Sequence, residues 1–398
     1  MDRLRLGIIG WGPRGRGVSL GVVRAAAGHL FDLVAAADPY EGRRQDAQEQ
    51  LGPEARVYPS HQELLQDPGV DAVLVFTGAQ AFAEVSCAAM RAGKPVCADV
   101  PMAFTRQDVW DLVVTSEQSG VPFCMAEQVR FANFVVRWQE HVERGDIGEV
   151  LFVQGEYIHP AISFYFNHTV TGDSNYATIQ EAATSPHYAP TWRNTFVDPI
   201  KYIPHELSPL LKIIGDRVAT VSCLTTDVRS QGDAVKMLDC QCALMMTDKG
   251  RTIRIVNSFT APRASQWEHH WYHIMGTDGV LESARPHWGD GALNWLNQDL
   301  MLDKAGQVTH TNYGWARADA PFGDASMGHS GLEAFVMRGF YDVVTSGCSD
   351  EFNVYTAMES VLPGIVAAES AAQGGAQLQV PDVRPSTERA AGTYPSKP

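Results

Sequence analysis

Three absences in the sequence narrow the class of protein. No apolar run is long enough to span a membrane, and no C-x-x-C pair occurs among the seven scattered cysteines. Because such cysteines are typical of reduced thiols, and the charged residues 1–5 lead straight into an apolar stretch, we expect a cytoplasmic protein without a signal peptide. A basic excess is also absent: the net charge is −15, which argues against nucleic acid or an anionic membrane as the partner.

The composition that remains is that of folded domains, with 45% hydrophobic and 19% charged residues. A chain of 398 residues has room for two cores. Strand and helix patterns alternate as far as residue 124, and β-rich segments then follow one another. We therefore predict an α/β fold: an N-terminal Rossmann domain with a doubly wound parallel sheet (1–125), a substrate-binding and oligomerisation α+β domain with a large open, mostly antiparallel sheet (126–383), and a flexible tail (384–398).

The most informative motif lies at the start of the chain. An apolar strand pattern leads into Gly10-x-Gly12-x-x-Gly15, and a helix pattern follows. Such glycines allow a tight turn, the approach of a pyrophosphate to the helix N-terminus, and close packing of helix on strand. A second strand pattern ends in Asp38, an acid suited to the ribose hydroxyls of NAD. The sequence therefore predicts NAD in preference to NADP, whose 2′-phosphate the acid would repel, although Arg43 and Arg44 stand close to the acid.

Further cofactor contacts are expected where other strands of this sheet end, because ligands of doubly wound sheets bind beyond the carboxyl ends of strands. Three short polar segments directly follow strand patterns. The predicted cofactor-binding residues are Gly10, Gly12, Pro13, Arg14, Gly15, Asp38, Thr77, Asp99, Val100, Pro101, Glu127 and Gln128.

Tyr202, His205 and His329 are the predicted catalytic residues. Pro204 suits the first turn of a helix, so His205 is expected at a helix N-terminus, where the dipole favours neutral imidazole. The Tyr202 hydroxyl is then a candidate proton donor or acceptor. Glycines around His329 would let a ligand approach closely. All three residues also fit ordinary roles in turns.

The predicted substrate-binding residues are Trp192, Arg193, Lys201 and Tyr157. An aromatic ring beside cations suits a stacked sugar with an anionic group, and it suits a solvated face equally well.

A run of histidines at 269, 270 and 273 looks at first like a metal site. In a strand, however, His269 and His273 share one face and His270 points away from it. We predict no metal site.

Taken in order, these motifs resemble the glucose-fructose oxidoreductase/inositol dehydrogenase (Gfo/Idh/MocA) family. The resemblance rests on the glycine motif with Asp38, the segment from Gly93 to Pro101, His205 before a short helix, and Gly276 to Glu282. It implies a Rossmann domain, an open-sheet domain that forms homodimers or homotetramers, and hydride chemistry on a small sugar or cyclitol.

Two departures separate the chain from most members of that family. Val100 replaces the usual lysine that handles the proton of the oxidised alcohol, and Ser208 replaces the aspartate of a His-x-x-Asp pair. A branch of NAD-dependent α-N-acetylgalactosaminidases and similar redox glycosidases also carries that valine. Its Tyr-x-x-His element is similar to Tyr202–His205, and its Gly-His-Gly-Gly stretch is similar to the segment at His329.

Resemblance to this branch implies redox-neutral glycoside hydrolysis with tightly bound, recycled NAD: oxidation at C3, elimination of the aglycone, addition of water and re-reduction. Two alternatives stay open. One is a sugar or glycoside 3-dehydrogenase that releases NADH, and the other is an NAD-binding sensor without catalysis.

Overall fold

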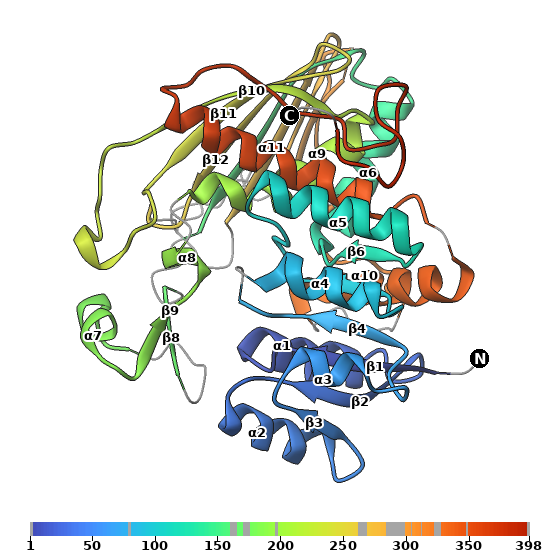
Figure 1. The fold of residues 1–398 in the computed structure, drawn as a ribbon. Helices are drawn as coiled ribbons and strands as arrows, with labels where there is room; N and C mark the ends of the chain where they lie inside the picture. Colours follow the sequence, from blue (N-terminus) through green and yellow to red (C-terminus); the bar gives the residue numbers. More distant parts are fainter. Residues whose placement is uncertain are drawn as a thin grey trace.

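The computed structural model describes residues 3–78, 81–159, 165–169, 176–195, 198–261, 269–283, 299–303, 305–311, 313–321, 328–347 and 349–395. In these ranges two large sheets lie one above the other, with several helices between them (Figure 1). None of the helices described has the length and apolar character needed to cross a membrane.

The first sheet has six parallel strands in the order β3-β2-β1-β4-β5-β6. The strands are β1 (Leu4–Ile9), β2 (Phe31–Ala37), β3 (Arg56–Tyr58), β4 (Ala72–Val75), β5 (Val96–Ala98) and β6 (Phe123–Met125). The intervening helices are α1 (Pro13–Val18) with its π-helical continuation η1 (Ser19–Arg24), α2 (Glu41–Leu51), α3 (His61–Leu65), α4 (Phe82–Arg91) and α5 (Arg106–Ser119). Strand order reverses between β1 and β4, which creates the switch point where such sheets bind ligands.

Local signals explain why these helices begin and end where they do. In α5, the side chains of Thr105 and Asp108 each accept a hydrogen bond from the other residue's backbone N–H, which forms a capping box. Gly120 ends the same helix with a φ of +67°, a left-handed conformation that favours glycine.

The second sheet has nine strands in the order β16-β15-β14-β13-β7-β12-β11-β10-β17. Only β7 and β12 run parallel to each other. The strands are β7 (Val150–Ile158), β10 (Val218–Thr225), β11 (Gln241–Thr247), β12 (Thr252–Ser258), β13 (His270–Gly276), β14 (Val280–Glu282), β15 (Asp299–Leu302), β16 (Val308–Thr311) and β17 (Leu378–Gln379). The predicted fold class, a doubly wound sheet plus a large and mostly antiparallel one, is confirmed.

Helix α9 (Pro204–Ile214) packs against both α6 (Asn133–Glu143) and α11 (Val354–Ala372) beneath the large sheet, whereas α10 (Gly328–Ser346) returns to the first sheet (Figure 1). In that return, the Phe340 ring of α10 stacks on Phe31 of β2 at 6.4 Å. The remaining elements are 3-10 helix η3 (Gln128–Phe131), α6 (Asn133–Glu143), β8 (Phe166–His168), α7 (Ile179–Thr184), β9 (Tyr188–Pro190), α8 (Trp192–Thr195), η5 (Pro199–Tyr202), α9 (Pro204–Ile214), η6 (Gly232–Ala234), α10 (Gly328–Ser346) and α11 (Val354–Ala372).

The C-terminal segment, which the sequence predicts to be a flexible tail, makes several contacts with α5. Arg389 pairs with Glu117 of α5 at 2.8 Å, and the two side chains are only 4% and 7% exposed. Gly392 N–H also donates to Glu117, and the Tyr394 hydroxyl donates to Asp111 of the same helix. Arg389, Gly392 and Tyr394 therefore all lie along α5.

Candidate functional site

The glycine motif lies at the switch point of the first sheet. Gly10 has a φ of +97°, and a Cβ there would overlap the carbonyl of Phe76; a Cβ on Gly15 would overlap the carbonyl of Gly10. Both positions therefore require glycine. Gly12 caps α1, with Pro13 at its first position, and a Cβ on Gly12 would contact only Nη1 of Arg43 at 3.7 Å. The loop thus leaves open space beside its backbone.

Asp38 closes β2 and is 3% exposed. Its carboxylate accepts hydrogen bonds from the backbone N–H groups of Trp11 and Tyr40, both at 2.9 Å, and Nη1 of Arg43 lies 3.7 Å away. Asp38 therefore ties the glycine loop to the end of β2, and carboxylate oxygens retain capacity for a further hydroxyl donor.

The residues around the loop fit a bound dinucleotide. Thr77 Oγ1 and Gln128 Oε1 are enclosed, and within the described part of the chain neither atom has a hydrogen-bond partner. Buried polar atoms without partners are rare, so these two atoms are available to a polar ligand. Val100, 6% exposed, follows β5 and offers no group that exchanges protons. A cis peptide bond joins it to Pro101.

Arg14 connects the cofactor loop to the second half of the chain. Its Nε lies 3.3 Å from both carboxylate oxygens of Asp99, and its Nη1 donates to Glu333 of α10 at 2.9 Å. Burial alone would lower the pKa of Arg14, but the two carboxylates raise it overall. Glu333 also lies 2.6 Å from Nδ1 of His329, so one buried carboxylate bridges the loop and a predicted catalytic residue.

The turn that carries His329 is strained. His329, Ser330 and Gly331 have φ values of +37°, +60° and +81°, a left-handed run that costs about 1–2 kcal/mol for each non-glycine residue. Burial would raise the pKa of Glu333, but His329 and Arg14 together lower it to about 2. This charged anchor holds the turn, while the His329 side chain stays 48% exposed.

Tyr202, His205 and Glu127 form a buried chain of polar contacts. The Tyr202 hydroxyl lies 2.9 Å from Nε2 of His205, and Nδ1 of His205 lies 2.7 Å from Oε2 of Glu127 in a contact that is not aligned as a hydrogen bond. Tyr202 ends η5 and Pro204 opens α9, so the sequence predicted this helix entry correctly. A carboxylate at Nδ1 favours the tautomer whose Nε2 accepts from a hydroxyl, which makes a proton relay.

Aromatic rings surround the relay. Trp192 stacks on Tyr202 at 4.9 Å, the Arg193 guanidinium lies 4.3 Å above the Trp192 ring, and Tyr157 lies 5.4 Å from Tyr202. Burial raises the pKa of Tyr202, and the nearby Arg193 opposes this rise. The structure thus brings three of the four predicted substrate residues to the relay. The fourth, Lys201, forms an ion pair with Asp198 at 3.5 Å.

Sequence reasoning missed two carboxylates of the site. Glu206 of α9 is 0% exposed, and its Oε1 lies 2.5 Å from Nδ1 of His270 in β13. Gly155 of β7 makes room for it, because a Cβ there would lie 3.0 Å from Cβ of Glu206. No sequence signal joins residues 206 and 270. The other missed carboxylate, Glu333, is four residues after His329, a helical spacing that was available as a signal.

The histidines near β13 pack against one another. Within the described ranges, no group of three or more His, Cys, Asp or Glu side chains is arranged to hold an ion. The rings of His159 and His269 lie 4.0 Å apart, and burial, followed by the charge of His269, lowers the pKa of His159 to about 3.

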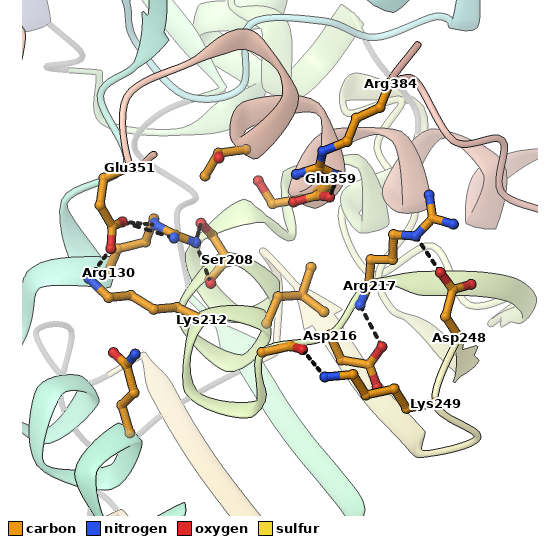
Figure 2. A pocket seen from close by; sticks show the side chains of 15 residues that line it. Arg130, Ser208, Lys212, Asp216, Arg217, Asp248, Lys249, Glu351, Glu359 and Arg384 are labelled. Atoms are coloured by element: carbon orange, nitrogen blue, oxygen red, sulfur yellow. Dashed lines mark hydrogen bonds and ion pairs between the residues drawn. The ribbon is translucent and has the colours of Figure 1, made fainter. Parts of the chain in front are cut away.

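A cavity of about 480 Å³ lies along the carboxyl half of α9 (Figure 2). Charged residues line it, including Arg130, Lys212 and Glu351, and most of the charged side chains drawn there point at a partner of opposite charge. None of the predicted site residues lines this cavity.

Comparisons with known proteins bear on the fold and on the cofactor. Residues 4–127 match the family model described as an oxidoreductase family with an NAD-binding Rossmann fold. A glycosyl hydrolase family 109 protein of Porphyromonas gingivalis is 26% identical over 71% of this chain, and the chain spans 60% of that protein's length. A protein of the same name from Saccharopolyspora erythraea is 24% identical over 96% of this chain and 83% of its own length.

Solved structures share the whole fold. Levoglucosan dehydrogenase in complex with NADH has a TM-score of 0.75 at 16% identity, covering 96% of this chain and 100% of that one. An oxidoreductase from Agrobacterium radiobacter in complex with NAD⁺, L-tartaric acid and magnesium has a TM-score of 0.71 at 19% identity, covering 95% and 99%. The predicted resemblance and the predicted cofactor, NAD, are thus confirmed: residues 4–127 match the model of the Gfo/Idh/MocA oxidoreductase family, which is described as an NAD-binding Rossmann fold.

Proposed function

We propose that the protein is an NAD-dependent enzyme that acts on a sugar or glycoside at C3, and that it hydrolyses glycosides without net redox change. The observation that carries the proposal is the buried Tyr202–His205–Glu127 relay, whose Glu127 follows β6 at the cofactor crevice. Relatives named glycosyl hydrolases favour hydrolysis over simple oxidation.

When bound, NAD supplies a hydride acceptor for C3 and later returns the hydride. The Tyr202 hydroxyl takes the proton of the C3 hydroxyl and passes its own proton to Nε2 of His205 across 2.9 Å. Glu127 stabilises the imidazolium that forms. This relay takes over the role that Val100 cannot perform.

Once C3 is a ketone, the neighbouring C2–H bond becomes acidic. Removal of that proton expels the aglycone from C1, and water then adds to the resulting enone. Trp192 and Tyr157 supply flat apolar surface for a sugar ring beside Tyr202. Arg193 adds a cation on the same side of the relay.

The outer face of the large sheet supports the predicted homo-oligomer. Leu224, Leu244 and Met275 lie on its strands and are 65%, 52% and 40% exposed. Large exposed apolar side chains on a sheet face are typical of protein contacts.

One experiment tests the proposed function against its alternatives. Purified protein is incubated with a panel of aryl α- and β-glycosides without added NAD, and aglycone release is followed together with absorbance near 340 nm. Aglycone release without net NADH supports hydrolysis. Stoichiometric NADH with an intact glycosidic bond indicates a 3-dehydrogenase, and no change in either signal indicates a sensor.

A further inference from the structure

Three histidines of the site share one arrangement. Each has its Nδ1 within 2.7 Å of a glutamate whose residue is at most 3% exposed. The pairs are His205 with Glu127, His270 with Glu206, and His329 with Glu333. A carboxylate at Nδ1 orients the ring and leaves Nε2 to exchange protons.

The second pair lies beside the first. The ring centres of His205 and His270 are 5.8 Å apart, and Tyr157 lies 5.8 Å from one and 4.9 Å from the other. Burial, and then the charges of nearby histidines including His205 and His329, lower the pKa of His270. The imidazole is therefore neutral near pH 7.

The two pairs differ in what their Nε2 atoms do. Nε2 of His205 is engaged by the Tyr202 hydroxyl. In the described part of the chain, the hydrogen bonds of His270 involve only Nδ1, which faces Glu206 at 2.5 Å and the Tyr272 hydroxyl at 3.3 Å. The His270 side chain keeps 11% exposure. The first pair, His205 with Glu127, thus exchanges a proton with the Tyr202 hydroxyl. In the second pair, His270 with Glu206, Nε2 is left for the substrate.

The strand packed against Glu206 leaves space for its side chain. Gly155 provides this space, and the Tyr272 hydroxyl, which neighbours Gly155 across the sheet, donates to the His205 carbonyl at 2.9 Å. Full burial of a carboxylate is costly unless a partner compensates it, so a carboxylate placed only for stability is a poor choice here.

We propose that His270, oriented by Glu206, is the base that removes the proton from C2 of the oxidised substrate. This inference rests on the proposed function. In the step, the C2–H bond breaks and its proton goes to Nε2 of His270. The electron pair of the C2–H bond forms the C1=C2 double bond. The C1–O bond breaks, and the aglycone leaves as an aryloxide with the electron pair of that C1–O bond.

The test separates elimination from oxidation by supplying the ketone directly. 4-Nitrophenyl 3-keto-α-D-glucopyranoside and its β anomer are prepared chemically and given to the wild type, His270→Gln and Glu206→Gln. Release of 4-nitrophenolate reports elimination, and deuterium uptake at C2 in D₂O reports removal of the proton. His273→Gln is the matched control, because His273 lies on the same strand but on the opposite sheet face, beside Gln154.

We expect His270→Gln to slow nitrophenolate release and deuterium uptake by about 100-fold or more, the usual range for loss of a general base. Glu206→Gln should lower both by a smaller factor, and His273→Gln should stay within twofold of the wild type. Bound NAD should be unchanged in His270→Gln, and so should the rate at which NADH first forms when the parent glycoside is added, because oxidation at C3 precedes the step assigned to His270. Both readouts show that the variant is folded.

Wild-type rates of elimination in His270→Gln would overturn the assignment of His270 while leaving the proposed function intact. If the wild type oxidises the parent glycosides but eliminates neither keto-glycoside, hydrolysis fails and the assignment fails with it. If the wild type does neither, the proposed function itself is overturned.

Discussion

The two ends of helix α9 carry polar clusters of opposite character. At its amino end lies the imidazole cluster, which we define as Tyr202, His205, Glu206, Glu127 and His270. Along its carboxyl half lies the ion-pair cavity of Figure 2, where Arg130 and Lys212 both reach Glu351, at 2.9 and 2.8 Å. The cavity has a volume of about 480 Å³, and Arg130, Lys212 and Glu351 are paired with one another in it.

The imidazole cluster and the ion-pair cavity differ in whether their side chains can exchange protons. Burial would raise the pKa of Glu351, but Arg130 and Lys212 lower it overall, so these groups stay charged and neutralise one another near pH 7. Imidazole and phenol groups can instead take up and release protons during a reaction. The volume of a cavity and the charge of its walls therefore do not by themselves identify groups that exchange protons.

The largest effect is expected from breaking the imidazole cluster. Tyr202→Phe and His205→Ala should each lower aglycone release by about 10²–10⁴-fold, because each removes a link of the relay. Bound NAD, measured by its absorbance after acid release, should stay at the wild-type level. Full activity in either variant would reject that residue as catalytic.

A smaller effect concerns the carboxylate that anchors His329. The pKa of Glu333 is about 2 in the folded protein and about 4.3 in an unfolded chain, so its contribution is present above pH 4.3 and is lost as the pH falls towards 2. The stability of the wild type relative to Glu333→Gln should therefore fall by up to about 3 kcal/mol across that window. Urea unfolding at a series of pH values measures it, and parallel pH curves would contradict it.

The ion-pair cavity should respond in stability and not in turnover. Lys212→Met should lower the free energy of unfolding by about 1 kcal/mol, because Arg130 still pairs with Glu351. Its kcat should remain within twofold of the wild type. A tenfold loss of kcat with bound NAD retained would mean that the cavity takes part in the reaction.

The smallest effect is expected at the strained turn. Ser330→Gly should stabilise the protein by about 0.5–1 kcal/mol in thermal or urea unfolding, because glycine adopts a φ of +60° without a steric penalty. Ser346→Gly, at the exposed end of the same helix, is the control and should bring no gain. A destabilised Ser330→Gly variant would show that the serine hydroxyl matters more than the strain.

What the sequence predicts well is local. The glycine motif, the buried strands and the entry of α9 at Pro204 all follow from spacings within a few residues, and the structure has each of them. The break between η3 and α6 is not foreseen in this way: Ala132 is extended there, with a ψ of 145°, and no periodic pattern reveals it.

What the sequence does not predict is the set of partners brought together by folding. Arg14 and Glu333 are 319 residues apart, and Glu206 and His270 are 64 apart, so their pairing depends on how α9 and α10 pack. The sequence therefore identifies most candidate residues singly. It does not identify Glu206 and Glu333, the carboxylates that lie at Nδ1 of His270 and His329.

The glycine at position 155 has a consequence for how related sequences can be sorted. Because a Cβ at position 155 would lie only 3.0 Å from Cβ of Glu206, we expect substitutions at the two positions to be linked during divergence, with glycine at 155 wherever a long side chain is buried at 206. Joint presence of glycine, glutamate and histidine at 155, 206 and 270 then becomes a three-position marker for sorting relatives. Chains with all three would form a subgroup recognisable before any assay is run.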